Sequence, residues 1–514
     1  MTEDQAQEEI FTFLADPAQH PNVRRIDTHA AAVFLEGARA LKIKRAVRFP
    51  FLDYSTLAKR KAACEQEIRV NRRFAPEIYR RVVPITRSAD GSLSIGGDGT
   101  PVEFAIEMNR FDERQTLDHV AEAGPPDAAL VDAIADTIAA SHATAPLAPG
   151  PAWVETILPI ISDNTTEFRT AGRFPVAAID RLDEASRVAV SRVRDLLHGR
   201  SRNGFVRRCH GDLHLANIVL IGPKPVLFDA IEFDPVIATN DVLYDLAFPV
   251  MDFICYDRDD AANALLNAYL LRTACENLDG LALLPLFLSL RAAIRAKVLL
   301  ARASSEPAVM PAARSYFALA LRAISPPPPV LVAIGGLSGT GKSILARGVA
   351  PGLAPLPGAV ILRTDVMRKQ LFGVNETDRL PKSAYLPEVT RQIYETLEQR
   401  AFRILSEGHS VVADAVFAGE QERAAIRNVA HKLNVQFAGV FLQTDLETRL
   451  NRVSRRERDA SDATPAIAER QDKYDIGRLD WAVVDASGPP EQTLTRCRAR
   501  IDESAHGQVE APPS

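Results

Sequence analysis

Apolar residues follow three different patterns along the 514-residue chain. In residues 23–110, short strand-like runs surround one helix-like segment, which predicts a small α+β unit. Residues 126–324 are mainly helical in periodicity, with an irregular insert of short β-type runs at 205–235. After residue 330, short continuous apolar runs alternate with helix-compatible segments, a pattern typical of a parallel sheet that is buried on both faces.

The elements of the first pattern can be given approximate bounds. Ser55 or Thr56 is a suitable N-cap for the helix, because a hydroxyl accepts a hydrogen bond from a free backbone N–H of the first turn. The expected helix and strands are Ser55–Phe74 for the helix, and Ala31–Leu35, Ala40–Val47 and Phe104–Met108 for the strands.

A serine followed by four prolines at 325–329 is the clearest boundary in the chain. Proline cannot continue a helix, so this run predicts a stiff extended linker between two separately folding halves. The first domain is expected at 1–324, with a small lobe to about residue 111 and a helical lobe after it. The second domain is expected at 330–503, and the polar tail 504–514 is expected to be disordered.

Composition and charge exclude several classes of protein. Apolar residues make up 46% and charged residues 25%, so a mainly disordered, collagen-like or coiled-coil protein is a poor fit. The net charge of −5 provides no overall positive field, which makes a nucleic-acid partner unlikely without excluding one. Five scattered cysteines without a C-x-x-C pair argue against a disulfide framework and structural zinc.

Two further features point to the cytoplasm. The acidic N-terminal sequence lacks the basic and apolar regions of a secretory signal. The longest apolar stretch, 278–290, is too short to span a bilayer, for which about 20 residues are needed. No membrane association is therefore expected.

The strongest chemical motif is GLSGTGKS at 336–343, which matches G-x-x-x-x-G-K-[ST]. An apolar strand precedes it and a helix-compatible run follows it, as a phosphate-binding loop requires. Backbone N–H groups would converge on phosphate oxygens, Lys342 would reach the β/γ-phosphates, and Ser343 would offer its hydroxyl to Mg²⁺. The expected nucleotide-binding residues are Gly336, Ser338, Gly339, Thr340, Gly341, Lys342 and Ser343.

The residues after this loop resemble the P-loop small-molecule and polynucleotide kinases. Asp365 and Arg368 form a D-x-x-R motif, which implies that Asp365 orients the acceptor hydroxyl and that Arg368 clamps acceptor or phosphate. Asp414 ends another apolar run and is expected at Mg²⁺. The arginine-rich segment 449–463 resembles a lid, and three of its residues are expected to stabilise the transferred phosphoryl group: Arg452, Arg455 and Arg456.

A second motif lies in the first domain. HGDLHLAN at 210–217 has the D-x-x-x-x-N spacing of a kinase catalytic loop, and an apolar run ending in Asp229 follows it. Together these residues resemble the aminoglycoside phosphotransferase family, a relative of the protein kinases. The resemblance implies that Asp212 accepts the acceptor proton and that Asn217 and Asp229 hold Mg²⁺.

The resemblance extends into the small lobe. Lys42 is similar to the strand lysine that holds the α/β-phosphates, and Glu67 to its helical partner. Lys44 lies on the same strand face as Lys42, and Glu65 is a competing partner, so both alternatives stay open. The segment 241–247 is expected to brace the catalytic loop, and His210 and His214 to orient it.

One departure from the family bears on activity. The segment expected to cover the phosphates, around 28–37, contains a single glycine and no G-x-G-x-x-G. A pseudokinase is therefore the alternative for the first domain.

These observations predict an α+β bilobal kinase-like domain followed by an α/β P-loop domain with a parallel sheet. The expected function is ATP- and Mg²⁺-dependent phosphotransfer at two nucleotide sites to hydroxyl groups of small molecules. The alternatives are a nucleotide-gated regulatory or interaction protein and a polynucleotide 5'-hydroxyl kinase in the second domain. Acceptor pockets lie on variable loops, so the sequence leaves both acceptors open, and it leaves the oligomeric state open as well.

Overall fold

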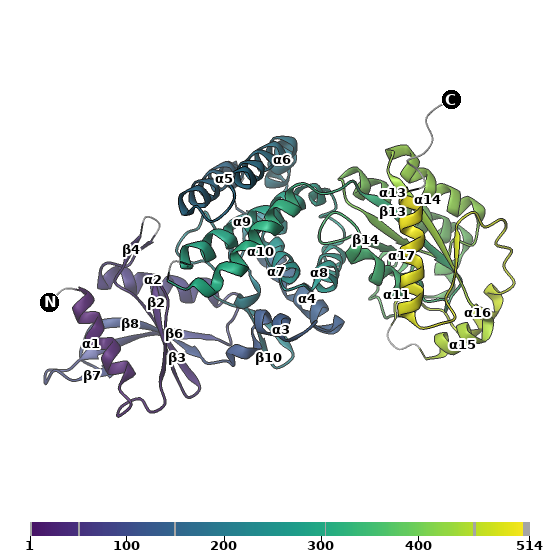
Figure 1. The fold of residues 1–514 in the computed structure, drawn as a ribbon. Helices are drawn as coiled ribbons and strands as arrows, with labels where there is room; N and C mark the ends of the chain where they lie inside the picture. Colours follow the sequence, from purple (N-terminus) through teal and green to yellow (C-terminus); the bar gives the residue numbers. More distant parts are fainter. Residues whose placement is uncertain (1–2, 50–51, 149–150, 304, 456–458, 507–514) are drawn as a thin grey trace. The chain divides into compact units, whose positions relative to one another are not determined.

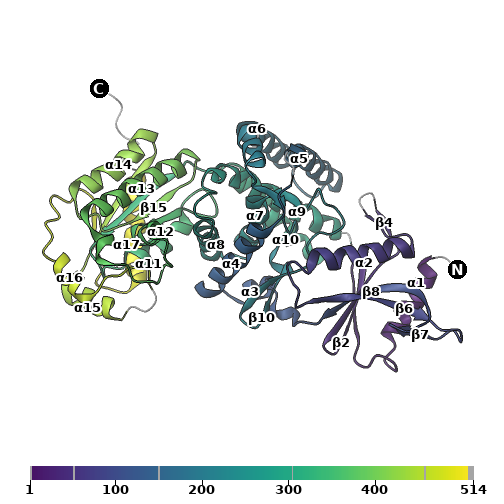
Figure 2. The same ribbon diagram turned by 180° about the vertical axis from the view of Figure 1, so that it is seen from behind.

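The computed structural model describes residues 3–49, 52–148, 151–303, 305–455 and 459–506 (Figures 1 and 2). Arg456 and most of the predicted disordered tail, 507–514, lie outside the described residues. The chain forms two compact units, and each is described by itself below. The first unit contains residues 1–157 and 197–252, and the second contains residues 158–196 and 253–514. This division does not coincide with the proline run at 325–329, and separate folding of the predicted halves stays a prediction.

The first part of the first unit is built around an antiparallel sheet. Its elements are α1 (Glu3–Ala15), β1 (Arg24–Asp27), β2 (Ala31–Glu36), β3 (Arg39–Lys44), β4 (Arg48–Phe49), β5 (Leu52–Asp53), α2 (Leu57–Asn71), β6 (Tyr79–Arg87), β7 (Leu93–Ile95) and β8 (Thr100–Asn109). Six of the strands form one sheet in the order β1-β2-β3-β8-β6-β7. Thr56 is the N-cap of α2 and accepts a hydrogen bond from the backbone N–H of Lys59, as predicted.

The alternation of side chains along β3 gives the two faces of this sheet different chemistry. Leu41 and Ile43 are buried in an apolar cluster with residues of α1. The intervening Lys42 and Lys44 point to the other face, where both contact Glu67 of α2. Because side chains of a strand alternate between faces, one short strand supplies both the core and two cations to the site.

The rest of the first unit surrounds the predicted catalytic loop. Its elements are η1 (Glu113–Gln115), α3 (Leu117–Ala123), α4 (Ala128–Thr144), β9 (Val206–Arg208), η2 (Leu215–Asn217), β10 (Ile218–Ile221), β11 (Lys224–Leu227), β12 (Thr239–Asp241) and most of α7 (Val242–Cys255). The short pairs β10-β11 and β12-β9 are both antiparallel. They account for the irregular β-type insert expected at 205–235.

The helices of the second unit come from two stretches of the chain. They are most of α5 (Pro151–Ala171) and α6 (Val176–Arg202), and then α8 (Asp259–Arg272), η3 (Asp279–Leu283), α9 (Leu284–Arg302), η4 (Pro307–Val309) and α10 (Met310–Ile324). Helix α10 packs along α9, and Phe174 stacks on Phe317 with ring centroids 4.1 Å apart. Aromatic stacking and aliphatic packing therefore hold these helices together.

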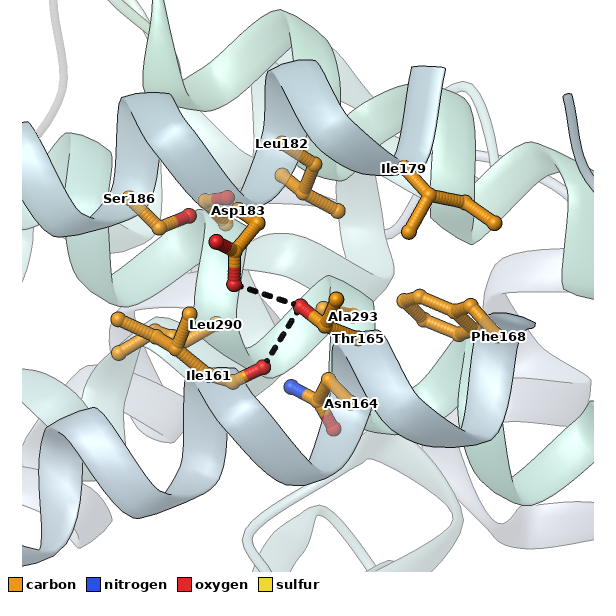
Figure 3. Close-up of a pocket in the computed structure, with 11 residues that line it drawn as sticks. Ile161, Asn164, Thr165, Phe168, Ile179, Leu182, Asp183, Ser186, Leu290 and Ala293 are labelled. Atoms are coloured by element: carbon orange, nitrogen blue, oxygen red, sulfur yellow. Dashed lines mark hydrogen bonds between the residues drawn. The ribbon is translucent and has the colours of Figure 1, made fainter. Parts of the chain in front are cut away.

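A small pocket lined by both apolar and polar side chains lies between α5, α6 and α9 (Figure 3). Thr165 donates its hydroxyl to Asp183 at 2.8 Å, within reach of the carbonyl of Ile161 at 2.9 Å. The carboxamide of Asn164 also lines the pocket, and it has no hydrogen-bond partner within the described part of the chain. The pocket thus combines one satisfied carboxylate with one buried amide.

The remainder of the second unit is an α/β fold. Its elements are β13 (Val330–Gly336), α11 (Lys342–Val349), η5 (Ala350–Gly352), β14 (Val360–Arg363), α12 (Thr364–Leu371), η6 (Lys382–Tyr385), α13 (Pro387–Ser406), β15 (Val411–Asp414), α14 (Glu420–Leu433), β16 (Gln436–Gln443), α15 (Leu446–Ser454), α16 (Pro465–Gln471), β17 (Ala482–Asp485) and α17 (Pro490–His506). All five strands run parallel, in the order β14-β15-β13-β16-β17.

Helices cover both faces of this sheet, as the continuous apolar strands predict. Helices α11 and α17 pack together on one face, and α13 and α14 pack on the other (Figures 1 and 2). Strand β13 is central, and its neighbours β15 and β16 lie on opposite sides of it. A parallel sheet binds ligands beyond the carboxyl ends of its strands at such a reversal of strand order, and the glycine-rich loop follows β13 there.

The edge of the sheet at β14 is covered by α8 in the same unit. Asn263 and Asn267 each donate from Nδ2 to the carbonyl of Ala359, at 3.0 and 3.1 Å, and Asn267 accepts from the N–H of Ile361 at 2.7 Å. Paired edge groups cannot recruit a strand from another chain. The side chains of Asn263 and Asn267 therefore pair backbone groups at this edge of the sheet, as a neighbouring strand would.

His409, just before β15, is a buried imidazole whose titration couples stability to pH. Its Nε2 donates to the carbonyl of Gly358 at 2.8 Å, and burial lowers its pKa to about 4. The unfolded chain, in which histidine has an ordinary pKa near 6.5, therefore binds more protons than the folded chain between pH 6.5 and 4.

We expect the second unit to lose about 3 kcal/mol of stability from this group as the pH falls from 6.5 to 4. His409→Gln should reduce the slope of unfolding free energy against pH over that interval, because glutamine has no proton to gain. Chemical denaturation of both proteins between pH 7.5 and 5 measures the difference. Parallel curves for the two proteins would contradict the assignment.

Candidate nucleotide and phosphotransfer sites

The first site begins at Lys42 on β3, which bridges two carboxylates. Its Nζ lies 2.9 Å from Glu67 Oε1 on α2 and 2.7 Å from Asp229 Oδ1. Glu67 is completely buried, whereas Glu65 is exposed and faces Lys61 at 3.8 Å. The structure therefore selects Glu67 over Glu65 as the helical partner of the strand lysine.

Lys44 belongs to the same network, so both candidate lysines, Lys42 and Lys44, contact Glu67. Its Nζ contacts the second oxygen of Glu67 and lies 2.6 Å from Oε1 of Glu232, which also accepts from the hydroxyl of Tyr54 at 3.5 Å. Sequence reasoning missed Glu232. The available signal was an acid three residues after Asp229 in a buried segment.

Charge compensation keeps Glu67 ionised although it is buried. Burial raises the pKa of Glu67, but the neighbouring Lys42 and Lys44 outweigh this effect and lower the pKa to about 2. Burial lowers the pKa of Lys42, and the neighbouring Asp229 and Glu67 outweigh this and raise it well above its ordinary value. At neutral pH Glu67 and Lys42 are therefore both charged.

The predicted catalytic loop places Asp212 and Asn217 side by side. Asn217 donates from Nδ2 to the backbone carbonyl of Asp212 at 2.9 Å and to its Oδ2 at 3.3 Å. His214 Nε2 lies 3.4 Å from the same Oδ2. The loop thus fixes the orientation of the Asp212 carboxylate, which is 40% exposed and accessible to an acceptor.

Acidic side chains of helix α7 accept hydrogen bonds from backbone N–H groups of this loop, as the expected brace at 241–247 predicts. Asp245 accepts from the backbone N–H of Gly211 at 2.9 Å and of His210 at 3.2 Å, and Asp252 accepts from that of Leu215 at 2.9 Å. His210 in turn donates from Nε2 to the carbonyl of Phe228 at 2.9 Å, next to Asp229. The contacts of Asp245 and Asp252 confirm the predicted brace, and the orienting role of His210 stays a prediction.

Asp229 has a backbone conformation that few residues adopt, with φ of +60°. Its N–H donates to the hydroxyl of Tyr79 at 3.1 Å. Asn71 clamps the next residue from both sides, accepting from Ala230 N–H at 2.7 Å and donating to its carbonyl at 3.1 Å. Tyr79 and Asn71 were missed, because their roles depend on segments about 150 residues apart in the chain.

The donor atoms at this site suit a hard cation. Asp229 offers carboxylate oxygens and is 45% exposed. Asn217 uses its Nδ2 on Asp212, which leaves its Oδ1 as the atom for a metal. Carboxylate and amide oxygens are ligands that Mg²⁺ accepts, so the residues present fit the metal that the sequence implies.

The second site begins at the glycine-rich loop between β13 and α11. Gly336, Gly339 and Gly341 have φ values of 141°, 91° and 95°. A Cβ at Gly339 would lie 2.7 Å from the carbonyl oxygen of Arg449, so a side chain does not fit there. Lys342 lies over the loop, with its Nζ 3.3 Å from the carbonyl of Leu337. The loop has the backbone of a phosphate cradle.

Two polar side chains meet at the end of this loop. Ser343 donates its hydroxyl to Asp414 Oδ2 at 2.6 Å, and Asp414 is the last residue of β15. The parallel pairing of β13 with β15 places Asp414 opposite Ile334, close to the loop. A serine hydroxyl and a carboxylate form an oxygen donor set that fits Mg²⁺.

Asp365 lies in the first turn of α12 and belongs to the same electrostatic cluster. Burial and the nearby Asp414 raise its pKa, and Lys342, Arg363 and the hydrogen-bonding side chain of Ser461 partly offset this rise. Arg363 was missed, although it ends β14 just before this turn. It lies 3.3 Å from Asp414 and 3.0 Å from Asp459.

The predicted arginines are dispersed. Arg368 is buried, donates to Ala384 O and to Thr390 Oγ1, and lies under the ring of Tyr385. Arg452 donates to the carbonyls of Ser487 and Gly488 at 3.4 and 3.2 Å, beside the loop after β17. Arg455 is exposed at the end of α15. The structure thus gives Arg368 and Arg452 protein partners, and their expected roles at phosphate stay predictions.

Two family models match the chain. The model for the "Phosphotransferase enzyme family" matches residues 18–284, just over half of the sequence. The chain belongs to this family. A model for an "AAA domain" matches residues 331–474, the part that contains the glycine-rich loop. The family member thus joins an aminoglycoside-phosphotransferase-like domain to a P-loop kinase-like domain, as predicted, and both imply phosphotransferase activity with nucleotide binding.

Relatives with both parts exist among curated proteins. Uncharacterized proteins of Mycobacterium tuberculosis (strain ATCC 25618 / H37Rv) and of Mycobacterium bovis are 30% identical over 482 residues, covering 91% of this chain and 93% of each relative. A gluconokinase structure from Sinorhizobium meliloti covers 35% of this chain and 96% of its own, with 18% identity and a TM-score of 0.26. A choline/ethanolamine kinase family structure from Mesorhizobium loti covers 62% and 99%, with 13% identity and a TM-score of 0.35.

The network around Glu67 predicts a specific nucleotide-binding defect. Glu67→Gln should weaken binding of the Mg²⁺–nucleotide to the first unit by about 10-fold or more, because Lys42 loses a charged hydrogen-bond partner. Calorimetric titration in a Lys342→Ala background, where the second site is weakened, isolates the first site. Glu65→Gln is the matched control on the same helix, and an equal loss in the control would contradict the assignment.

Proposed function

We propose that this protein is an ATP- and Mg²⁺-dependent phosphotransferase with two nucleotide sites, each transferring the γ-phosphoryl group to a hydroxyl of a small molecule. The observation that carries the proposal is the double bridge at Lys42. One ammonium joins the helical Glu67 to Asp229, so the groups that we propose for phosphate and metal binding lie together. Positioning of this kind is the main contribution a protein makes to phosphoryl transfer.

In the first site, each residue then has a role. Lys42 holds nucleotide phosphates, with its position set by Glu67. Asn217 and Asp229 hold the metal, which offsets phosphate charge when it is bound. Asp212 orients the acceptor hydroxyl and takes its proton.

In the second site, the loop residues from Gly336 to Ser343 bind the nucleotide, and Ser343 and Asp414 hold the metal. Asp365 orients the acceptor. Arg452 and Arg455 remain candidates for stabilising the phosphoryl group, and Arg452 must leave the carbonyls of Ser487 and Gly488 to do so.

The alternative functions make different demands. A regulatory protein needs nucleotide binding without transfer, and the lack of a G-x-G-x-x-G near residues 28–37 favours it for the first domain. The retained Asp212, Asn217 and Asp229 favour the enzyme. A polynucleotide kinase is disfavoured by the net charge of −5, because nucleic-acid affinity depends on positive charge.

We also propose that the protein acts in the cytoplasm. The support is the sequence, whose five scattered cysteines include no C-x-x-C pair and suit a reducing compartment. Among the helices that the structure describes, none has the length and apolar character to cross a membrane.

Two single variants assign any measured transfer to one site. Asp212→Asn should lower turnover at the first site by about 10² or more while Mg²⁺–ATP still binds, because the metal ligands remain. Asp365→Asn should have the same effect on the second site. Transfer of label from γ-labelled ATP to a pooled metabolite and sugar library measures both.

A third variant separates a metal ligand from an acceptor-orienting group. Asp229→Asn should lower turnover in the same labelling assay and should also weaken metal-dependent nucleotide binding, measured by calorimetric titration. Unchanged labelling of every acceptor in both Asp212→Asn and Asp365→Asn would refute the proposed catalytic roles. Nucleotide binding without any labelled acceptor would favour the regulatory alternative.

A further inference from the structure

A carboxylate from a distant segment is bound beside Asp365 by three donors. Lys369 Nζ lies 2.7 Å from Asp462 Oδ1, while the Tyr385 hydroxyl and the Leu380 N–H donate to Asp462 Oδ2 at 2.7 and 3.0 Å. We call Lys369, Leu380 and Tyr385 the anion cradle. The catalytic roles proposed above do not use it.

The anion cradle has the properties of a built site. The Lys369 side chain is only 1% exposed. A buried ammonium is costly unless an anion pairs with it, and Asp462 supplies that anion. Although burial raises the pKa of Asp462, hydrogen bonds from Lys369 and Tyr385 hold it below its ordinary value. The bound form is therefore a carboxylate, and the cradle selects negative charge.

The cradle also lies next to the group proposed to orient the acceptor. Lys369 follows Asp365 by one turn on the same face of α12. The carboxylate of Asp365 is close enough to Tyr385 to raise the pKa of its hydroxyl, after the larger effects of burial and of Asp462. A molecule bound in the cradle is thus within reach of Asp365.

The residue before Asp462 completes the arrangement. The side chain of Ser461 lies close enough to the carboxyl of Asp365 to lower its pKa. Two successive residues therefore present a hydroxyl to Asp365 and a carboxylate to the anion cradle, which are the two groups of a hydroxy acid.

We propose that Ser461 and Asp462 occupy the acceptor subsite of the second nucleotide site, and that its acceptor carries a hydroxyl together with a carboxylate or phosphate. The acceptor displaces both side chains, places its hydroxyl at Asp365 and its anionic group in the cradle. This inference rests on the proposed function of that site. In the transfer, the acceptor O–H bond breaks and Asp365 takes the proton, while the new O–P bond forms and the β–γ bond breaks to release ADP.

Charge explains why a neutral acceptor does not suit the subsite. When Asp462 leaves, the buried ammonium of Lys369 retains, among the described residues, only the carbonyl of Asp378 as a partner and lacks an anion. A sugar or alcohol without an anionic group offers only weaker hydrogen bonds to it. Asp462 is therefore a built-in competitor that only an anionic acceptor displaces efficiently.

The test measures binding to the full chain rather than transfer. Sulfate, D-gluconate and the neutral counterpart D-sorbitol are titrated calorimetrically at constant ionic strength, with saturating Mg²⁺–ADP to occupy the glycine-rich loop. Asp462→Asn should bind sulfate and D-gluconate about 10-fold or more tightly than the wild type, because the competing charge is gone. Binding of D-sorbitol should not change.

Further variants show where the anion binds. Adding Lys369→Met to Asp462→Asn should abolish the gain in affinity for sulfate and D-gluconate. Adding Tyr385→Phe, a milder change, should reduce that gain. Asp459→Asn is the matched control, because it loosens the same segment at Arg363 without emptying the cradle. Thermal denaturation checks that each variant is folded.

Three results would overturn the proposal: no gain in Asp462→Asn, an equal gain for D-sorbitol, or an equal gain in Asp459→Asn. Retention of the gain in both double variants would place the anion elsewhere. These outcomes are distinct from failure of the proposed function, because anion binding is measured whether or not phosphate is transferred.

Discussion

Burial of the Glu67 carboxylate is the constraint on which the first site depends. A fully buried negative charge is unstable without compensation, and Glu67 is compensated by two lysines of one strand. The same lysines reach Asp229 and Glu232, so one helix residue connects the sheet to the segment that follows the catalytic loop. The position of the Asp229 carboxylate, the proposed metal ligand, is therefore coupled to the packing of α2.

The second unit also places charged groups close together, but it does so with a glycine-rich loop in place of paired side chains. Its proposed anion-binding surface is the backbone of a loop whose glycines have positive φ. Burial and the nearby Asp414 raise the pKa of Asp365. Arg363 and Lys342 moderate that repulsion. The first site thus relies on a side-chain network and the second on a loop conformation, and each has a distinct weak point for mutation.

The proposed acceptor subsite at Ser461 and Asp462 would add a level of control to the second site. Asp462 pairs with the buried Lys369, and the side chain of Ser461 lies close enough to Asp365 to lower its pKa. A ligand must provide equivalent groups to replace them, and this requirement acts as a chemical filter. Selectivity would then come from the contacts that the acceptor displaces as well as from those it makes.

The sequence by itself determined the features that depend on neighbouring residues. The glycine-rich loop, its flanking strand and helix, the D-x-x-x-x-N loop and the N-cap Thr56 are local patterns, and the structure has each where it was expected. The family model also matches the region in which the kinase-like motifs were found.

Tertiary structure alone decided which distant charges meet. It chose Glu67 over Glu65, used both Lys42 and Lys44, and paired Lys369 with Asp462 across 93 residues of chain. It also placed Arg368 and Arg452 against protein carbonyls. The resemblance to P-loop kinases instead predicts acceptor or phosphate as the partner of Arg368 and the phosphoryl group as that of Arg452. The physical reason is that a motif specifies a residue type at a position, whereas the partner of a charged side chain depends on which segments folding brings together and how far water is excluded there.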